Sequence, residues 1–314
     1  MSKKRDPRLI AQGAYGCAFA PALPCEPGTA RGKVAGPRTV GKLFKLSVGT
    51  ADDEAQTARS VDRFDPAHRY TPALLGRCRV SPKTLATAAQ AQAKAGKSCR
   101  GTLGLPVGFP SDGADQVIFQ SAGDASVEAL LGSPLSWHDR EALLASFVDV
   151  LQAVAAMRAK GLVHMDLHAG NVVVDRMRRQ RWRAKVIDFG WLSPIATAWL
   201  STAGVRNLIR HPPTPFTDTG ALARRALQAV VARSPRAEGG ATALEAAASL
   251  DAFAVGAMMW RVLAHPAKGS QQPPASRRGV ADAVAQVAAG LTHPMVRSRT
   301  TPEQAARELR AAFR

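Results

Sequence analysis

The chain has 314 residues, 46% of them hydrophobic, which excludes a mainly disordered protein and allows two lobes that share a cleft. No apolar run approaches the roughly 20 residues of a membrane span, and no apolar segment follows the basic start, so we expect a cytoplasmic protein without a membrane partner. The net charge of +18 permits an acidic partner or nucleic acid, but the basic residues are scattered among few aromatic ones. An Ala- and Arg-rich composition throughout the chain favours a compositional origin of this charge.

All cysteines lie in the first third of the chain, at Cys17, Cys25, Cys78 and Cys99. They contain no CxxC pair, and no histidine stands at the spacing of a zinc site. Cysteines of a protein in a reducing compartment stay unpaired, so we expect free thiols.

The first predicted elements are a strand, a glycine turn and a second strand over residues 9–19. Gly13 and Gly16 lie in or beside the turn, where the lack of a Cβ lets backbone N–H groups approach phosphate oxygens. A Gly-x-x-Gly pair by itself is common and is usually only a turn. A third strand, over residues 39–45, carries Lys42 on one face and Lys45 on the other.

A short helix is predicted over residues 51–64, with Glu54 as its only glutamate. Two further strands are predicted over residues 74–80 and 116–120. Between them, residues 81–104 are rich in Ala, Gln and Lys, which indicates an excursion that is part helix and part loop.

The second part of the chain reads as helical. Residues 137–160 carry apolar side chains at a period near 3.6, and Gly161 ends this helix. An apolar helix is predicted to begin at Asp251, and Gly256 follows five positions later. The Asp251 carboxylate either caps this helix or, if it is buried, needs hydrogen-bond donors. Residues 301–303, Thr-Pro-Glu, predict the start of a last helix.

Two short segments carry the strongest chemical pattern in the chain. Residues 164–171 read His-Met-Asp-Leu-His-Ala-Gly-Asn, and residues 186–190 read Val-Ile-Asp-Phe-Gly. The apolar runs between them, separated by a basic turn, predict a hairpin that brings Asn171 and Asp188 to the same edge. Because Mg²⁺ takes hard oxygen ligands, these two side chains suit a magnesium site, and Asp166 can face a substrate hydroxyl.

The paired segments resemble the catalytic loop and the Asp-Phe-Gly metal motif of protein kinases and their relatives. The resemblance covers residues from about 9 to 312, and the Gly-Ala-Tyr-Gly-Cys and Gly-Lys-Leu-Phe segments are similar to kinases of giant DNA viruses. It implies an α+β, bilobal fold with a β-rich N-lobe over residues 1–119 and a helical C-lobe over residues 120–314. If the protein is viral, the resemblance places it in the host cytoplasm or the virion.

The resemblance also implies roles for individual residues, with ATP and Mg²⁺ as cofactors. The catalytic residues are Asp166 as the base, Lys42, His168 and Asn171. The nucleotide-binding residues are Gly13, Gly16, Lys42, Glu54, Gln120 and Ala122. The metal ligands are Asn171 and Asp188.

Three supporting assignments come from the same resemblance. Lys42 binds the phosphates and pairs with Glu54, although Lys45 is the alternative lysine and a glutamate here also stabilises a helix N-terminus. Phe189 packs in the core beneath the metal motif. Asp251 matches the aspartate that holds the backbone of the catalytic loop.

The sequence departs from the family pattern at three places. Met165 replaces an arginine that pairs with a phosphate on the activation segment, so we expect no activation by phosphorylation at Thr197, Ser201 or Thr202. His168 stands where Ser/Thr kinases carry a lysine, and this histidine is familiar in aminoglycoside and choline phosphotransferases. No glutamate follows the His-Pro-Pro at residues 211–213, which leaves Arg299 without its usual ion-pair partner.

Three functions are compatible with this pattern: a Ser/Thr protein kinase, a small-molecule phosphotransferase of the aminoglycoside or choline type, and a pseudokinase scaffold. A scaffold needs none of the four residues that are retained, Lys42, Asp166, Asn171 and Asp188. The glycine loop, the Asp251 helix and the Arg299 loop favour the protein kinase over the small-molecule enzyme. The expected acceptor is therefore a hydroxyl group of a protein.

Overall fold

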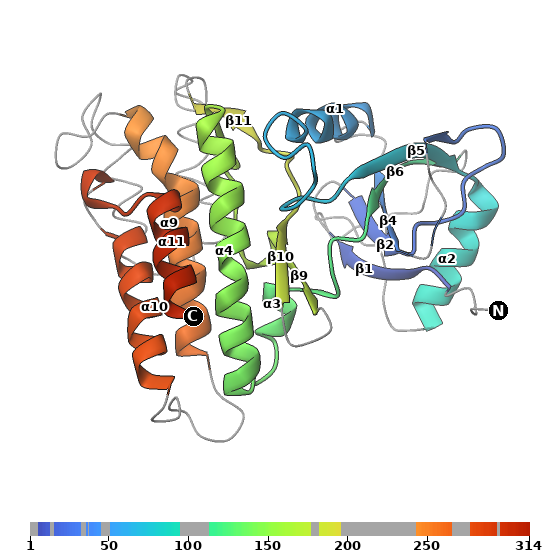
Figure 1. Ribbon diagram of the computed structural model, residues 1–314. Coiled ribbons are helices and arrows are strands. Elements are labelled where there is room, and N and C mark those ends of the chain that lie inside the picture. The colour runs from blue at the N-terminus through green and yellow to red at the C-terminus, as the bar shows by residue number, and fades with distance from the viewer. Residues whose placement is uncertain are drawn as a thin grey trace. The chain divides into compact units, whose positions relative to one another are not determined.

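The structure is a computed structural model of the chain. It describes residues 6–12, 16–32, 36, 38–44, 51–94, 113–176, 182–195, 243–265, 277–293 and 296–314. The chain divides into two compact units: unit 1 comprises Met1–Asp62 and Pro72–Ser121, and unit 2 comprises Arg63–Thr71 and Ala122–Arg314. The described residues form antiparallel sheets and seven α-helices, which confirms the predicted α+β class (Figure 1). The grouping of Arg63–Thr71 with unit 2 differs from the predicted division at residues 119 and 120.

Unit 1 contains a six-stranded antiparallel sheet in the order β1-β2-β4-β6-β5-β3 (Figure 1). Its strands are β1 (Arg8–Gln12), β2 (Gly16–Ala20), β3 (Arg31–Gly32), β4 (Thr39–Phe44), β5 (Leu74–Val80) and β6 (Ala114–Gln120). The predicted strands in these regions are confirmed. The short β3 was not predicted: it lies in the connection between β2 and β4, and it pairs with β5 at the far edge of the sheet.

Two helices cover opposite faces of this sheet, because successive side chains of a strand alternate between its faces. Helix α1 (Ala51–Val61) packs against Phe44 of β4 and Val117 of β6. Helix α2 (Pro82–Lys94), the helical part of the predicted excursion, packs on the other face against residues that include Leu43. Both faces of the sheet are therefore buried within unit 1.

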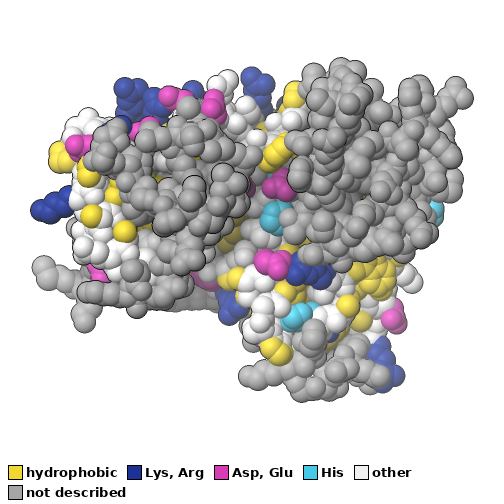
Figure 2. All heavy atoms as spheres, turned by 180° about the vertical axis from the view of Figure 1, so that it is seen from behind, with side chains coloured by type: hydrophobic (Ala, Val, Ile, Leu, Met, Phe, Trp, Pro, Cys, Tyr) yellow, Lys and Arg dark blue, Asp and Glu magenta, His cyan; other side chains and the backbone are white. Residues whose placement is uncertain are grey.

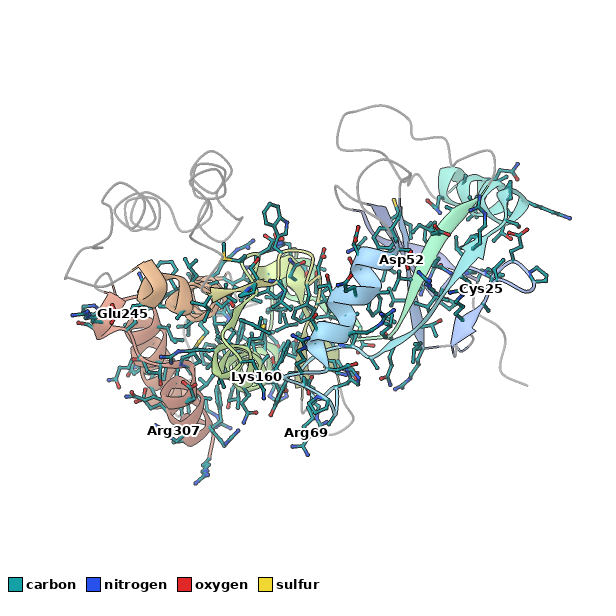
Figure 3. The ribbon with its side chains drawn as sticks, turned by 90° about the horizontal axis from the view of Figure 1, so that it is seen from above. Cys25, Asp52, Arg69, Lys160, Glu245 and Arg307 are labelled. Carbon is teal, nitrogen blue, oxygen red and sulfur yellow. A yellow bond between two sulfur atoms is a disulfide. The ribbon has the colours of Figure 1, made fainter. Side chains whose placement is uncertain are left out.

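The expectation of free thiols is wrong, because Cys25 and Cys78 form a disulfide (Figure 3). Their Cα atoms are 5.6 Å apart although the residues are 53 positions apart in sequence. The connection that carries Cys25 runs beside β5, where the Glu26 N–H donates to the Arg79 carbonyl oxygen over 2.7 Å. Cys17 is also disulfide-bonded. The spacing of cysteines along the chain did not show this proximity, since it depends on where the connection crosses the sheet.

We expect the Cys25→Ala/Cys78→Ala double variant to lose about 2–4 kcal/mol of the free energy of unfolding of unit 1. The reason is that the cross-link restricts the unfolded chain between two distant residues. Urea unfolding of the full chain, followed by far-UV circular dichroism, measures the change, and tryptophan fluorescence reports unit 2 separately because every tryptophan lies there. Equal unfolding free energies for the wild type and the variant would contradict the expectation.

Unit 2 is built around the long helix α4 (Trp137–Ala159), which matches the predicted helix over residues 137–160. Helices α9 (Ala243–Ala264) and α11 (Pro302–Ala312) pack against α4, and α10 (Arg278–Leu291) packs against both of them (Figure 1). Among the described residues, α4 is the only helix long and apolar enough to cross a membrane, but 56% of its apolar stretch is buried in the protein. A core helix of a globular protein meets the same criteria, so this is weak evidence for a membrane span.

The remaining elements of unit 2 are short. Strands β9 (Val172–Arg176) and β10 (Trp182–Val186) form the predicted hairpin, and β7 (Ala125–Ser126) pairs with β9. Strand β8 (Leu162–Val163) pairs with β11 (Ser193–Pro194). These strands position the segments on either side of them, residues 164–171 and 187–192.

Candidate functional site

The β9–β10 hairpin brings the two predicted motifs together in unit 2. Val172 pairs with Val186, so the residues just outside the hairpin, Asn171 and Ile187, are also neighbours. The Ile187 N–H donates to the Asn171 carbonyl oxygen over 2.9 Å. Asp188 follows directly, and its carboxylate is close enough to act on the pKa of Asp166. The predicted juxtaposition of the motifs is therefore present.

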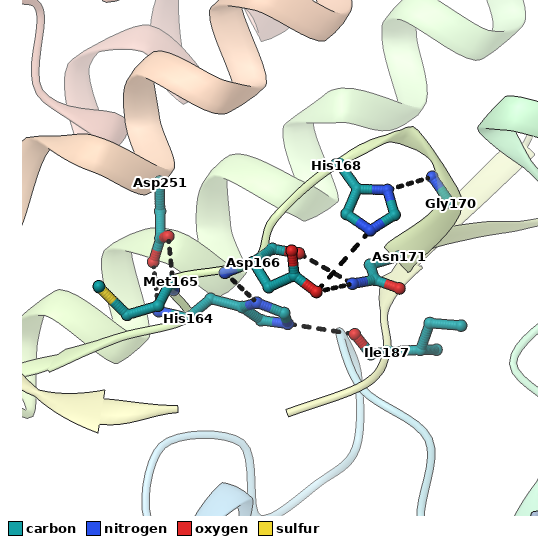
Figure 4. Close-up of polar contacts among 8 residues, drawn as sticks. All are labelled: His164, Met165, Asp166, His168, Gly170, Asn171, Ile187 and Asp251. Carbon is teal, nitrogen blue, oxygen red and sulfur yellow. Dashed lines mark hydrogen bonds and ion pairs between the residues drawn. The ribbon is translucent and has the colours of Figure 1, made fainter. Parts of the chain in front are cut away.

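Asp166 and Asn171 are joined by two hydrogen bonds within the loop that precedes β9 (Figure 4). The Asn171 Nδ2 donates to the backbone oxygen of Asp166 over 2.8 Å and to its Oδ2 over 3.2 Å. Because Nδ2 is engaged on this side, the Asn171 amide oxygen points away from Asp166 (Figure 4). An oxygen held in this orientation suits a cation.

His168 is oriented by the short helical turn η1 (Ala169–Asn171). Its Nδ1 accepts the Gly170 N–H over 3.0 Å, so the neutral ring carries its proton on Nε2. That Nε2 lies 3.8 Å from Oδ2 of Asp166 (Figure 4). The predicted catalytic residues Asp166, His168 and Asn171 thus form one cluster.

The Asp166 carboxylate lies in an environment that raises its pKa. Burial is the largest cause, and the charge of Asp188 adds to it, whereas His168 and the hydrogen bond from Asn171 act in the opposite direction. A carboxylate with a raised pKa accepts a proton more readily than an ordinary aspartate. This property suits a base that receives a hydroxyl proton.

His164 is a buried residue of the site to which the sequence pattern assigned no role. Its Nδ1 accepts the Asp166 N–H over 3.3 Å, and its Nε2 donates to the Ile187 carbonyl oxygen over 3.1 Å (Figure 4). Burial lowers the pKa of His164 to about 4, so the ring is neutral at pH 7. The ring thereby links the segment of Asp166 to the segment of Asp188.

Phe189 packs in the core beneath the motif, as predicted. Its ring lies 4.9 Å from the His164 ring and 6.0 Å from the Phe64 ring, centroid to centroid. The backbone on either side of this contact is unusual, because Met165 has φ 68° and Asp188 has φ 59°. Positive φ in residues other than glycine costs of order 1–3 kcal/mol and often accompanies function.

Asp251 holds the strained loop from behind, as predicted, but the expectation that it begins or caps its helix is wrong, because α9 already begins at Ala243. It accepts the His164 N–H at Oδ2 over 2.7 Å and the Met165 N–H at Oδ1 over 3.3 Å (Figure 4). Burial raises the pKa of Asp251 to about 6, and the two backbone donors oppose that rise. Gly256, on the same helix, has no room for a side chain, since an added Cβ would lie 2.7 Å from Cβ of Leu291.

The site residues predicted in unit 1 include an ion pair between β4 and α1. The Lys42 Nζ lies 3.1 Å from both carboxylate oxygens of Glu54. The side chains are 19% and 13% exposed, so the pair is largely protected from water. Lys45, the alternative lysine, lies outside the described residues. The predicted contact between Lys42 and Glu54 is confirmed, while the role of the pair in phosphate binding stays a prediction.

Of the other predicted nucleotide-binding residues, the structure describes Gly16, Gln120 and Ala122. Gly13 lies outside the described residues, and Gly16 begins β2, where a Cβ would collide with the Leu43 carbonyl oxygen. Close packing of β2 on β4 is therefore a sufficient reason for glycine at position 16. Gln120 ends β6 in unit 1, and Ala122 begins the main segment of unit 2. Their contact with an adenine base stays a prediction.

Arg299 has neutral partners within the described part of the chain. Its guanidinium donates to the His293 carbonyl oxygen over 2.9 Å and to Ser249 Oγ over 2.8 Å, and it lies 4.8 Å from the Phe253 ring centroid. Burial lowers the pKa of Arg299 to about 10. Thr197, Ser201 and Thr202, where phosphorylation is expected not to activate the protein, and the His-Pro-Pro segment lie outside the described residues.

The described charged side chains do not indicate a further binding site. On the face shown in Figure 2, the described Lys and Arg side chains lie apart from one another, and several have Asp or Glu side chains beside them. Among the described residues, no group of three or more His, Cys, Asp and Glu side chains is arranged as a metal site. Mg²⁺ needs fewer protein ligands when phosphates and water complete its coordination, so the role of Asn171 and Asp188 as its ligands stays a prediction.

Comparison with known proteins adds no assignment. No protein-family model matches the chain, and no curated protein is significantly similar to it.

Proposed function

We propose that the protein is an ATP- and Mg²⁺-dependent phosphotransferase with a bilobal, protein-kinase-like fold, and that it acts as a Ser/Thr protein kinase. The main support is the arrangement around Asp166. The buried His164 and Asp251 hold a loop that presents Asp166 beside Asn171 and within the electrostatic reach of Asp188. A surface loop without a function needs neither this buried polar support nor the positive φ of two non-glycine residues.

In this proposal, Asp166 accepts the proton of the acceptor hydroxyl. The hydroxyl oxygen forms a bond to the γ-phosphorus of ATP, and the bond between this phosphorus and the β–γ bridging oxygen breaks. Asn171 and Asp188 would hold Mg²⁺, which would supply positive charge beside the phosphates. Lys42, oriented by Glu54, binds the α- and β-phosphates, and ADP leaves with the bridging oxygen. Gly13, Gly16, Gln120 and Ala122 keep the nucleotide-binding roles implied by the resemblance.

A small-molecule phosphotransferase is the second candidate, and His168 is the observation that favours it. The Nδ1 bond to Gly170 leaves Nε2–H as the donor on the Asp166 side of the ring. The Nε2–H of His168 offers one hydrogen bond to a γ-phosphate oxygen, where the lysine of Ser/Thr kinases offers an ammonium group.

The test is transfer of ³²P from γ-labelled ATP to a panel of basic and acidic proteins, aminoglycosides and choline. Label on protein serine or threonine supports the protein kinase, and label only on the small molecules supports the second candidate. The absence of label with bound ATP leaves two readings, a scaffold or an enzyme whose acceptor is not in the panel.

A further inference from the structure

Helix α1 carries three acidic residues in its first turn, Asp52, Asp53 and Glu54. Acidic side chains near a helix N-terminus are favourable by themselves because of the helix dipole. Two of them also reach cations on the sheet: Glu54 pairs with Lys42 of β4, and Asp52 pairs with Arg77 of β5. The helix is thus held by two ion pairs on two different strands.

The positions of the two cations follow from the strand register. Lys42 and Arg77 both pair with Val117 of β6, one from each side, so the three residues form one row across the sheet. Residues directly opposite one another in adjacent strands point to the same face. Val117 packs in the cluster that includes Ala51 of α1, so this face is the one that α1 covers.

The positions of the two carboxylates follow from helix geometry. Asp52 and Glu54 are two residues apart, and at 3.6 residues per turn their side chains leave the helix about 200° apart. They therefore emerge on opposite sides of α1. Strands β4 and β5 flank β6 and lie about 10 Å apart, which is about the width of a helix with its side chains. One ion pair thus forms on each side of a helix that lies over β6.

We propose that Arg77 is a positioning residue that acts through Asp52 to fix the rotation of α1 and so keep Glu54 on Lys42. The buried apolar face of α1 and the ion pair at Glu54 already restrain the helix, and the pair at Asp52 adds a second polar restraint on the opposite side against rotation about its axis. This inference rests on the proposed function where it concerns nucleotide binding. Its structural part, the restraint of α1, stands independently of that function.

The contact is partly exposed, and this exposure limits the size of its effect. The Arg77 side chain is 31% exposed and the Asp52 side chain 72% exposed. Partly exposed ion pairs contribute little, so the expected change in KM for ATP is an increase of about two- to fivefold in Arg77→Gln, with a smaller change in kcat. Asp52→Asn should give the same increase, and the double variant should add nothing to either single variant.

Arg31→Gln is the matched control. Arg31 lies on β3, directly opposite Arg77, and its substitution by Gln removes the same charge from the sheet. The ion pair to α1, however, is made by Arg77. We expect Arg31→Gln to leave KM for ATP within the error of the wild type. The conservative variant Arg77→Lys should retain most of the wild-type affinity.

Hydrogen–deuterium exchange of the α1 amides, without nucleotide, measures the restraint directly. Faster exchange in Arg77→Gln and Asp52→Asn, but not in Arg31→Gln, is the expected result. Unchanged exchange in Arg77→Gln, or equal effects of Arg77→Gln and Arg31→Gln, would overturn the inference. If the wild type does not turn over ATP, the proposed function fails, and the exchange experiment still decides whether Arg77 positions α1.

Discussion

Asp166→Asn is expected to reduce phosphotransfer by about 10²–10⁴-fold, the contribution typical of a positioned general base. Asparagine has the same shape and retains an oxygen for the hydrogen bond from Asn171 Nδ2, but it does not accept a proton. The nucleotide contacts are left intact, so kcat should fall while KM for ATP stays near the wild-type value. Steady-state kinetics at saturating acceptor measures both constants.

Asp175→Asn is a matched control for this variant, because Asp175 lies on β9 in the same unit and undergoes the same change of charge and shape. It should keep wild-type kinetics. Near-UV circular dichroism of both variants shows whether unit 2 retains its packing. A fully active and folded Asp166→Asn variant would contradict the assignment of Asp166 as the base.

Asp251→Ala is expected to have the largest effect on stability, a loss of roughly 2–5 kcal/mol in the free energy of unfolding of unit 2. The substitution leaves the buried N–H groups of His164 and Met165 without an acceptor, and each unmade hydrogen bond costs about 1–3 kcal/mol. The loop loses the contact that holds its strained backbone, so phosphotransfer should also be lost. Chemical denaturation gives the free energy, and a stability equal to that of the wild type would show that the loop has another support.

The pH dependence of stability gives a second test at the same residue. The pKa of Asp251 is raised to about 6 in the folded protein, above the value of 3.8 for an ordinary aspartate. The folded state therefore binds this proton more tightly, and the resulting stabilisation is complete below pH 3.8 and is lost as the pH rises through 6. Asp251→Asn lacks this titration, so its destabilisation relative to the wild type should be greater at pH 5 than at pH 7.5. An unchanged difference between the two pH values would contradict the raised pKa.

The contacts that the sequence predicted best depend on motifs with a local geometry. The hairpin between Asn171 and Asp188 follows from two apolar runs and a turn, and the contact of Asp251 with the loop follows from a resemblance in residue order. The pairing of Lys42 with Glu54 was predicted in the same way. These contacts need only the succession of elements to be read correctly.

The contacts that the sequence did not predict depend on where a chain segment crosses the sheet. The connection between β2 and β4 runs to β5 and brings Cys25 to Cys78, which no spacing of cysteines indicates. The ion pair of Arg77 with Asp52 requires the strand order and the rotation of α1. The hydrogen bonds of His164 require the tertiary position of Ile187. These contacts depend on how each unit packs, and no local pattern in the sequence predicts them.

The measurement that tests the central claim most directly is ³²P transfer from γ-labelled ATP by the wild type and Asp188→Asn, each with Mg²⁺ and with excess EDTA. We expect transfer by the wild type only when Mg²⁺ is present, and a loss of that transfer in Asp188→Asn with its fold intact. Transfer that is unchanged in the folded Asp188→Asn variant, or that persists in EDTA, would contradict a Mg²⁺-dependent phosphotransferase built on Asp166, Asn171 and Asp188.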